Sequence, residues 1–178
     1  QPDAVIGFGG YPSIPPLLGA RFHGRRHPAL NIHEGNAVVR KANAVLARFA
    51  DVIATSFPTV AKLRMGARTV LTGMPVRPAI AALAGEPWSA PTQDISLLVW
   101  GGSLGARIFS QVVPAAIARL PAELRARINL TQQARADDVD AVRQAYADMG
   151  VKARVEPFLN DVPALLRAAH LVIGRAGG

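Results

Sequence analysis

A short apolar run in the middle of the chain ends abruptly at a cluster of glycines. Residues 95–100 are almost entirely apolar, residues 101–107 read Gly-Gly-Ser-Leu-Gly-Ala-Arg, and apolar residues then recur at helical spacing. This order predicts a buried strand, a tight turn and a helix start. Glycines allow close approach of the backbone, and the first amides of a helix carry the positive end of its dipole, so the turn favours a bound phosphate. A tight turn without a ligand is the alternative, because every domain of alternating strands and helices needs such turns.

Strand and helix patterns alternate through the rest of the second half. Strands are predicted at 128–131, 153–156 and 171–173, and helices at 106–120, 137–149 and 161–169, the first of them bent at Pro114. Alternation of this kind is typical of an α/β domain with a parallel sheet. Residues 79–94 have little periodicity beyond a helical turn at 80–83, and we interpret them as a linker between two domains.

The first half follows the same plan. Strands are predicted at 5–6, 29–33, 52–54 and 69–72. Helices are expected after Ser13, after Asn36 and at Pro58, with Ser13 and Asn36 as caps. The first strand runs into Gly7-Phe8-Gly9-Gly10-Tyr11, which is a second candidate turn for a phosphate.

Polar residues follow two of these strands. His33, Glu34 and Asn36 stand at the end of the strand 29–33, where open parallel sheets bind their ligands. Arg77 follows the strand 69–72 between structure-breaking residues, which favours an anion clamp. The alternatives are a structural imidazole at His33, simple capping by Asn36 and a surface arginine at 77.

Charge and composition limit the classes of partner that the chain could bind. The chain has 178 residues, a formal net charge of +8 and no cysteine. It has no secretory signal pattern and no apolar run near the roughly 20 residues of a membrane span, so we expect a cytoplasmic setting. The basic residues between positions 21 and 48 lie beside apolar ones, which favours either an anionic lipid surface or a solvated basic face with ordinary core leucines. The residues of this predicted membrane surface are Leu17, Leu18, Phe22, Arg25 and Arg26.

Other chemistries lack their sequence signatures. The four histidines form no His-Glu-x-x-His motif. Residues 101–105 match neither the dinucleotide fingerprint nor a Walker loop. The basic residues lack interleaved aromatic residues for base stacking, which argues against nucleic acid. We therefore expect no metal, no cofactor and no nucleic-acid partner.

Six motifs taken in order resemble those of a known family. They are Gly7-Phe8-Gly9-Gly10-Tyr11, His33-Glu34-Gly35-Asn36-Ala37, Gly73-Met74-Pro75-Val76-Arg77, Gly101-Gly102-Ser103-Leu104-Gly105-Ala106-Arg107, Pro157-Phe158-Leu159-Asn160-Asp161 and Arg175-Ala176-Gly177. In order and spacing they resemble the bacterial lipid-I N-acetylglucosaminyltransferases of peptidoglycan synthesis, the MurG family. The resemblance implies a GT-B architecture, with two Rossmann-like domains facing a cleft, both incomplete here. Residues 1–78 would be the later part of the N-terminal acceptor domain, 79–94 a linker, and 95–178 the earlier part of the UDP-sugar domain.

The resemblance also implies roles for individual residues. The predicted donor contacts, to UDP-N-acetylglucosamine, are Asn36, Arg77, Gly102, Ser103, Leu104, Gly105 and the backbone of Leu159. The turn formed by Gly7, Gly9, Gly10 and Tyr11 would bind the diphosphate of the lipid acceptor. The family's general base would precede Gln1, and Glu34 is a weak candidate within this chain. Three positions depart from the family pattern: Gly35, Met74 and Leu104.

The implied activity is an inverting transfer of N-acetylglucosamine to a polyprenyl-diphosphate-linked N-acetylmuramoyl-pentapeptide. The enzyme would act peripherally at the cytoplasmic face of the bacterial inner membrane in cell wall synthesis, and this chain alone would be inactive. Two alternatives stay open: a GT-B glycosyltransferase with another glycolipid acceptor, and a truncated UDP-sugar-binding module without catalysis. An acceptor panel, or UDP binding without transfer, would distinguish them.

Overall fold

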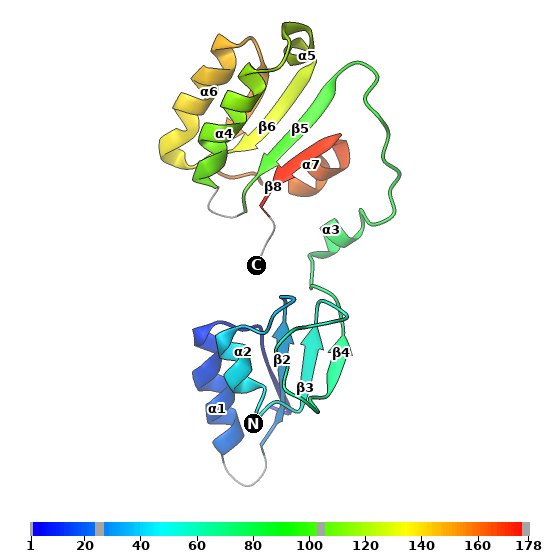
Figure 1. The fold of residues 1–178 in the computed structure, drawn as a ribbon, viewed down its shortest axis with the longest axis vertical. Coiled ribbons are helices and arrows are strands. Elements are labelled where there is room, and N and C mark those ends of the chain that lie inside the picture. The colour runs from blue at the N-terminus through cyan, green and yellow to red at the C-terminus, as the bar shows by residue number, and fades with distance from the viewer. Residues whose placement is uncertain (1, 24–26, 103–105, 176–178) are drawn as a thin grey trace. The chain divides into compact units, whose positions relative to one another are not determined.

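The computed structural model describes residues 2–23, 27–102 and 106–175 (Figure 1). The chain divides into two compact units, one up to Val76 and one from Arg77 onward. Each unit carries a four-stranded sheet in which every described pairing is parallel. The predicted α/β class is therefore confirmed.

The first unit builds its sheet in chain order, β1-β2-β3-β4. Its elements are β1 (Ala4–Gly7), a 3₁₀ turn (Tyr11–Ser13), α1 (Ile14–Phe22), β2 (Ala29–Glu34), α2 (Lys41–Leu46), β3 (Val52–Thr55) and β4 (Thr69–Leu71). Helices α1 and α2 lie together beside the sheet (Figure 1). Leu17 of α1, Leu46 of α2 and Ile32 and Ile53 of the sheet form the buried core.

The second unit orders its strands β7-β6-β5-β8. Its elements are α3 (Pro78–Ala81), β5 (Ile95–Trp100), α4 (Arg107–Ala118), α5 (Ala122–Ala126), β6 (Ile128–Gln133), a 3₁₀ turn (Ala136–Asp138), α6 (Val139–Asp148), β7 (Lys152–Glu156), α7 (Val162–Ala168) and β8 (Leu171–Gly174). The chain adds β6 and β7 on one side of β5 and then returns to place β8 on the other side.

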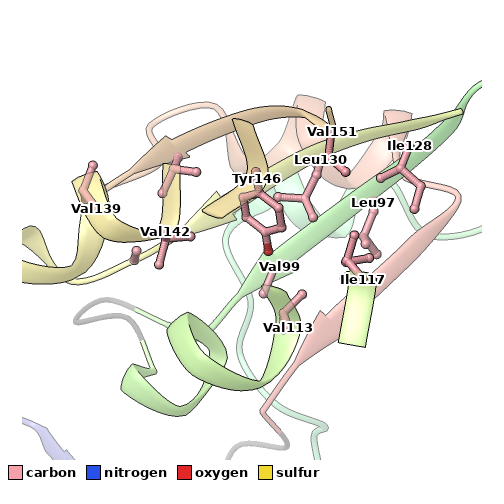
Figure 2. Close-up of a cluster of buried hydrophobic side chains, with 12 residues drawn as sticks. Leu97, Val99, Val113, Ile117, Ile128, Leu130, Val139, Val142, Tyr146 and Val151 are labelled. Atoms are coloured by element: carbon pink, nitrogen blue, oxygen red, sulfur yellow. The ribbon is translucent and has the colours of Figure 1, made fainter. Parts of the chain in front are cut away.

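Strand β5 supplies both cores of this unit, because its side chains alternate between the two faces of the sheet. Leu97 and Val99 pack with residues of α4 and α6 around the fully buried Tyr146 (Figure 2). Leu98 and Trp100 pack on the opposite face in a smaller cluster with α7. The near-continuous apolar run of β5 follows from this burial on both faces.

Most predicted elements are found with shifts at their ends, but two helix starts in the first unit were wrong. Residue Val38 forms a short parallel bridge with Ala61, and the Val39 amide donates to the Ala61 carbonyl (3.0 Å). This pairing keeps both segments extended. Helix α2 therefore begins at Lys41 with Arg40 as its cap, and not at Asn36, and no helix forms at Pro58.

Two smaller differences concern a cap and a missed helix. Ser13 stands at the cap position of α1, but its hydroxyl donates to the Gly9 carbonyl (2.7 Å) and caps no amide of the helix. The five-residue helix α5 was not predicted, because so short a segment shows little periodicity. Within the described ranges, no helix has the length and apolar character needed to span a membrane.

Candidate functional sites at the strand ends

The strand order of the second sheet reverses beside β5. Strands β6 and β8 lie on opposite sides of β5, so the chain turns away in two directions at its carboxyl end. Open α/β sheets bind ligands at such reversal points, in the crevice outside the carboxyl ends of the strands. The glycine turn that follows Trp100 lies at this position.

The backbone at this turn requires glycine. A Cβ on Gly101 would lie 2.5 Å from the Ala106 amide nitrogen, and Gly102 has a φ of 87°. Gly174 at the end of β8 lies close to the end of β5, since a Cβ on Gly174 would be 3.3 Å from the Trp100 carbonyl oxygen. These glycines let two strand ends and a turn approach one another. The predicted donor residues Ser103, Leu104 and Gly105 lie outside the described residues.

The turn between β7 and α7 contains the predicted nucleotide contact Leu159. The Leu159 side chain is buried against Leu98 of β5 and Val162 of α7, and this contact anchors the turn to the core. At the start of the turn, Gln133 Nε2 donates to the Pro157 carbonyl (3.2 Å). Arg154 of β7 forms hydrogen-bonded ion pairs with Glu156 before the turn and Asp161 after it, and these pairs hold the pKa of each carboxyl below its usual range.

In the first unit, the carboxylate of Glu34 organises the segment that follows β2. Only 1% of the residue is exposed, and its two oxygens accept four hydrogen bonds. Oε1 accepts from the Asn36 amide (3.0 Å) and from Asn36 Nδ2 (2.8 Å). Oε2 accepts from the Arg40 amide (3.1 Å) and from Asn43 Nδ2 (2.9 Å). Asn36 is thereby fixed in orientation without capping a helix.

These bonds also determine the ionisation of Glu34. Burial by itself would raise the pKa of the carboxyl. Hydrogen bonds from Asn36, Asn43 and the Arg40 amide outweigh burial, and the pKa lies below its ordinary value of 4.5. A carboxylate held in this way is a poor proton acceptor near neutral pH. The geometry suits a positioning role for Glu34 better than that of a general base.

The contacts of the His33 imidazole indicate a structural role. Its ring is buried, its Nε2 donates to the Gly73 carbonyl (3.0 Å), and the Phe8 ring lies 5.4 Å away between centroids. Ser56 Oγ is 3.4 Å from the same nitrogen. Because Nε2 carries a proton for the carbonyl, the imidazole ties the end of β2 to the segment that leads to Met74 and Arg77.

The glycine turn after β1 is also shaped by close packing. A Cβ on Gly7 would lie 2.7 Å from Leu17 Cδ1, and Gly9 and Gly10 have φ values of 84° and 76°. Gly9 lies beside the buried Asn43, whose Nδ2 would be 3.4 Å from a Cβ. The side chain of Tyr11, at the end of this turn, is exposed.

Arg77 precedes α3 in an extended conformation and is exposed. Its carbonyl accepts from the amides of Ile80 (2.9 Å) and Ala81 (3.0 Å), so its backbone fixes the start of the helix. In the described part of the chain, no hydrogen bond or ion pair uses its guanidinium. The side chain remains open to an anion.

The predicted membrane surface needs a correction. Leu17 is only 4% exposed and belongs to the core, and Leu18 packs partly against the same core. Their apolar character serves the contact of α1 with the sheet, so Leu17 is not available to a membrane. Phe22 is 70% exposed, and its ring forms an edge-on pair with the ring of Phe49. Arg25 and Arg26 lie outside the described residues.

A hollow along the α7 face of the second sheet does not coincide with the predicted sites. Ser96, Thr131, Lys152 and Leu165 are among its lining residues. These strand residues lie toward the amino ends or the middle of β5, β6 and β7, whereas the predicted contacts follow the carboxyl ends. We therefore place the candidate sites at the strand ends.

Asn43, Gln132 and Gln133 are among the buried polar residues that sequence reasoning missed. Asn43 stands one position from the buried Ala42 on α2, and a polar residue among core positions was the available signal. Gln132 and Gln133 end β6, where the rule applied to His33 and Glu34 would have selected them.

The chain is similar to known glycosyltransferases along almost its whole length. Residues 96–178 match the glycosyltransferase family 28 C-terminal domain. A UDP-N-acetylglucosamine–N-acetylmuramyl-(pentapeptide) pyrophosphoryl-undecaprenol N-acetylglucosamine transferase of Gluconobacter oxydans is 55% identical over 98% of this chain and 48% of its own length. The equivalent transferase of Granulibacter bethesdensis is 54% identical over 99% of this chain and 46% of its own length.

The fold is also similar to that of a solved structure. The crystal structure of Acinetobacter baumannii MurG matches 98% of this chain and 47% of its own chain, with a TM-score of 0.72 and 32% sequence identity. This chain therefore spans about half the length of the relatives it matches.

Proposed function

Since this chain belongs to the MurG family of glycosyltransferases and has its GT-B fold, we propose that it is part of an enzyme that transfers N-acetylglucosamine from UDP-N-acetylglucosamine to a lipid acceptor. The acceptor is N-acetylmuramoyl-pentapeptide linked through a diphosphate to undecaprenol. The observation that carries the proposal is 55% identity, over 98% of the chain, to a transferase named for this reaction.

The donor's diphosphate is assigned to the turn after β5. Negative charge builds on the departing UDP as the anomeric bond breaks, and preorganised amides and cations lower that barrier. The reversal of the sheet beside β5, the close backbone approach at Gly101 and the positive φ of Gly102 support a phosphate site there. We assign Ser103, Leu104 and Gly105 to the same contact, and the Arg77 guanidinium to the developing charge.

Asn36 is assigned to a hydroxyl of the donor sugar. Its amide nitrogen and Nδ2 are both held by Glu34 Oε1, so the side-chain Oδ1 faces away from that carboxylate as an oriented acceptor. Glu34 then acts by positioning Asn36. A role for Glu34 as general base stays a prediction.

We assign the turn of Gly7, Gly9, Gly10 and Tyr11 to the acceptor diphosphate. Positive φ values at Gly9 and Gly10 favour a backbone that presents amides to an anion. The exposed Phe22 and the net charge of +8 support peripheral attachment to an anionic membrane, which we place at the cytoplasmic face of the inner membrane.

A chimera tests the proposal without assuming what flanks this chain. In the Gluconobacter oxydans relative, the segment that matches this chain is replaced by residues 1–178. The chimera is incubated with UDP-N-acetylglucosamine and a short-chain analogue of the lipid acceptor, and the product is measured by mass spectrometry. We expect transfer to the muramoyl-lipid, with no transfer to a diphosphate lipid that lacks the muramoyl unit.

The unaltered relative controls for the assay. A folded chimera that binds UDP but transfers nothing, while the unaltered relative is active, would refute the proposed activity for this chain. Equal transfer to unrelated glycolipids would refute the proposed acceptor.

A further inference from the structure

Two adjacent glutamines end β6 and face opposite sides of the sheet. Gln132 lies on the α6 side, where its Oε1 accepts from the Tyr146 hydroxyl (2.6 Å). Gln133 lies on the α7 side, where its Nε2 donates to the Pro157 carbonyl (3.2 Å). Both residues are essentially fully buried. Each carboxamide therefore loses its hydrogen bonds to water, and burial is costly unless protein groups replace them.

The bond from Gln133 continues the pairing of β6 with β7 into the next turn. Gln133 and Glu156 are paired residues of the two strands, and the Ala134 amide donates to the Glu156 carbonyl (3.0 Å). The Gln133 side chain then reaches the first residue beyond β7. Backbone and side chain together fix where the turn leaves the sheet.

The carboxamide of Gln133 is not explained by packing. Its Oε1 is buried and has no hydrogen-bond partner among the described residues. An apolar side chain of similar size would avoid that cost. The compensating feature is the bond to Pro157, which an apolar side chain could not make.

The turn held in this way is the one assigned to the nucleotide. The Leu159 side chain points into the cluster with Leu98 and Val162. At Leu159 the turn therefore meets a ligand through its backbone, whose amide and carbonyl positions depend on how Pro157 is held.

We propose that Gln133 is a positioning residue for nucleotide recognition: its bond to Pro157 sets the backbone of residues 157–160 so that it can select uracil. This inference rests on the proposed use of a UDP-sugar. Gln133 contacts the turn and not the nucleotide, so its loss should reduce base selectivity while leaving the phosphate contacts at the turn after β5 in place.

The test is a set of calorimetric titrations on the 178-residue chain with UDP, ADP and inorganic diphosphate. The variant Gln133→Met keeps the length of the side chain and removes the donor to Pro157. We expect the ratio of UDP to ADP affinity to fall about tenfold, with diphosphate affinity unchanged within twofold. Gln133→Leu serves as a second variant should the first not fold.

Tyr146→Phe is the matched control. It removes a buried hydrogen bond to the neighbouring Gln132 on the opposite face of the sheet, so it lowers stability without touching the turn. We expect a lower melting temperature and unchanged base selectivity.

Two results would overturn the role of Gln133. One is unchanged UDP selectivity in a folded Gln133 variant. The other is a parallel loss of UDP, ADP and diphosphate binding that follows the melting temperature, as in Tyr146→Phe. A wild-type chain that binds UDP and ADP equally would instead refute the proposed nucleotide-sugar function, and the role of Gln133 with it.

Discussion

Replacing Glu34 by glutamine tests the hydrogen-bond network that holds Asn36. The substitution preserves the shape of the side chain but turns one carboxylate oxygen into an NH₂ group. Each oxygen accepts two bonds, one pair from Asn36 and the other from Arg40 and Asn43. In either orientation of the new amide, its NH₂ group replaces an oxygen that accepted two hydrogen bonds, so two donors are left facing another donor.

The loss of stability caused by Glu34→Gln can be estimated from these hydrogen bonds. A hydrogen bond to a charged group contributes about 1.5 to 3 kcal/mol, so losing two costs about 3 to 6 kcal/mol. The lower penalty for burying a neutral amide in place of a charge offsets part of this loss. We expect the free energy of unfolding of the first unit to fall by about 3 kcal/mol.

Hydrogen exchange measured by mass spectrometry is the suitable assay. Both tryptophans, Trp88 and Trp100, belong to the second unit, so tryptophan fluorescence would not report on the first. Faster exchange is expected in the peptide covering residues 29–46. The control is Glu86→Gln, which breaks an exposed ion pair with Arg167 in the second unit and should leave that peptide unchanged.

The pH dependence has a defined sign. Because the pKa of Glu34 is lower in the folded state, its stabilisation is fully present above about pH 4.5 and is lost as pH falls through the lowered value. The difference between wild type and Glu34→Gln should therefore be constant from pH 7 to pH 5. It should shrink only below about pH 4.5.

Two results would refute this reasoning. Exchange at the wild-type rate in residues 29–46 would mean that the carboxylate network does not hold the segment. A chimera carrying Glu34→Gln that is as stable as its parent yet inactive would favour the base role over positioning.

Three further predictions concern the proposed ligands. In the chimera, Arg77→Ala should reduce transition-state stabilisation by about 2 to 4 kcal/mol; a change in kcat/KM below about threefold would exclude that role. Phe22→Ser should weaken the salt-sensitive binding of the chimera to anionic vesicles, measured by sedimentation, whereas Phe57→Ser, which changes another exposed aromatic residue, should not. Equal binding of the chimera to neutral and anionic vesicles would contradict this membrane contact. Ser103→Ala should weaken UDP binding by about 1 to 3 kcal/mol with little change in melting temperature, while the reverse pattern would mean a plain helix cap.

Local sequence alone determined the strands and most helices. The bounds of β5 follow directly from its apolar run and the glycines after it, since a strand buried on both faces must be apolar throughout. The alternation in the second half likewise predicted a parallel sheet. The positions of the glycine turns were also readable, because Gly9, Gly10 and Gly102 adopt φ values that other residues rarely reach.

Pairing between distant segments decided the rest. Asn36 has the residue type of a helix cap, yet the bridge between Val38 and Ala61 keeps its surroundings extended, and no local pattern encodes a contact across so many residues. Leu17 could have been core or surface until α1 was packed on the sheet.

The strand order of the second sheet is the clearest case. Each strand carries the same apolar signal whichever neighbours it takes, so only the folded chain reveals that β8 returns to the free side of β5. That reversal places a ligand site after Trp100. The bond from Gln133 to Pro157 arises in the same way, because it joins two residues that become neighbours only when β6 and β7 pair.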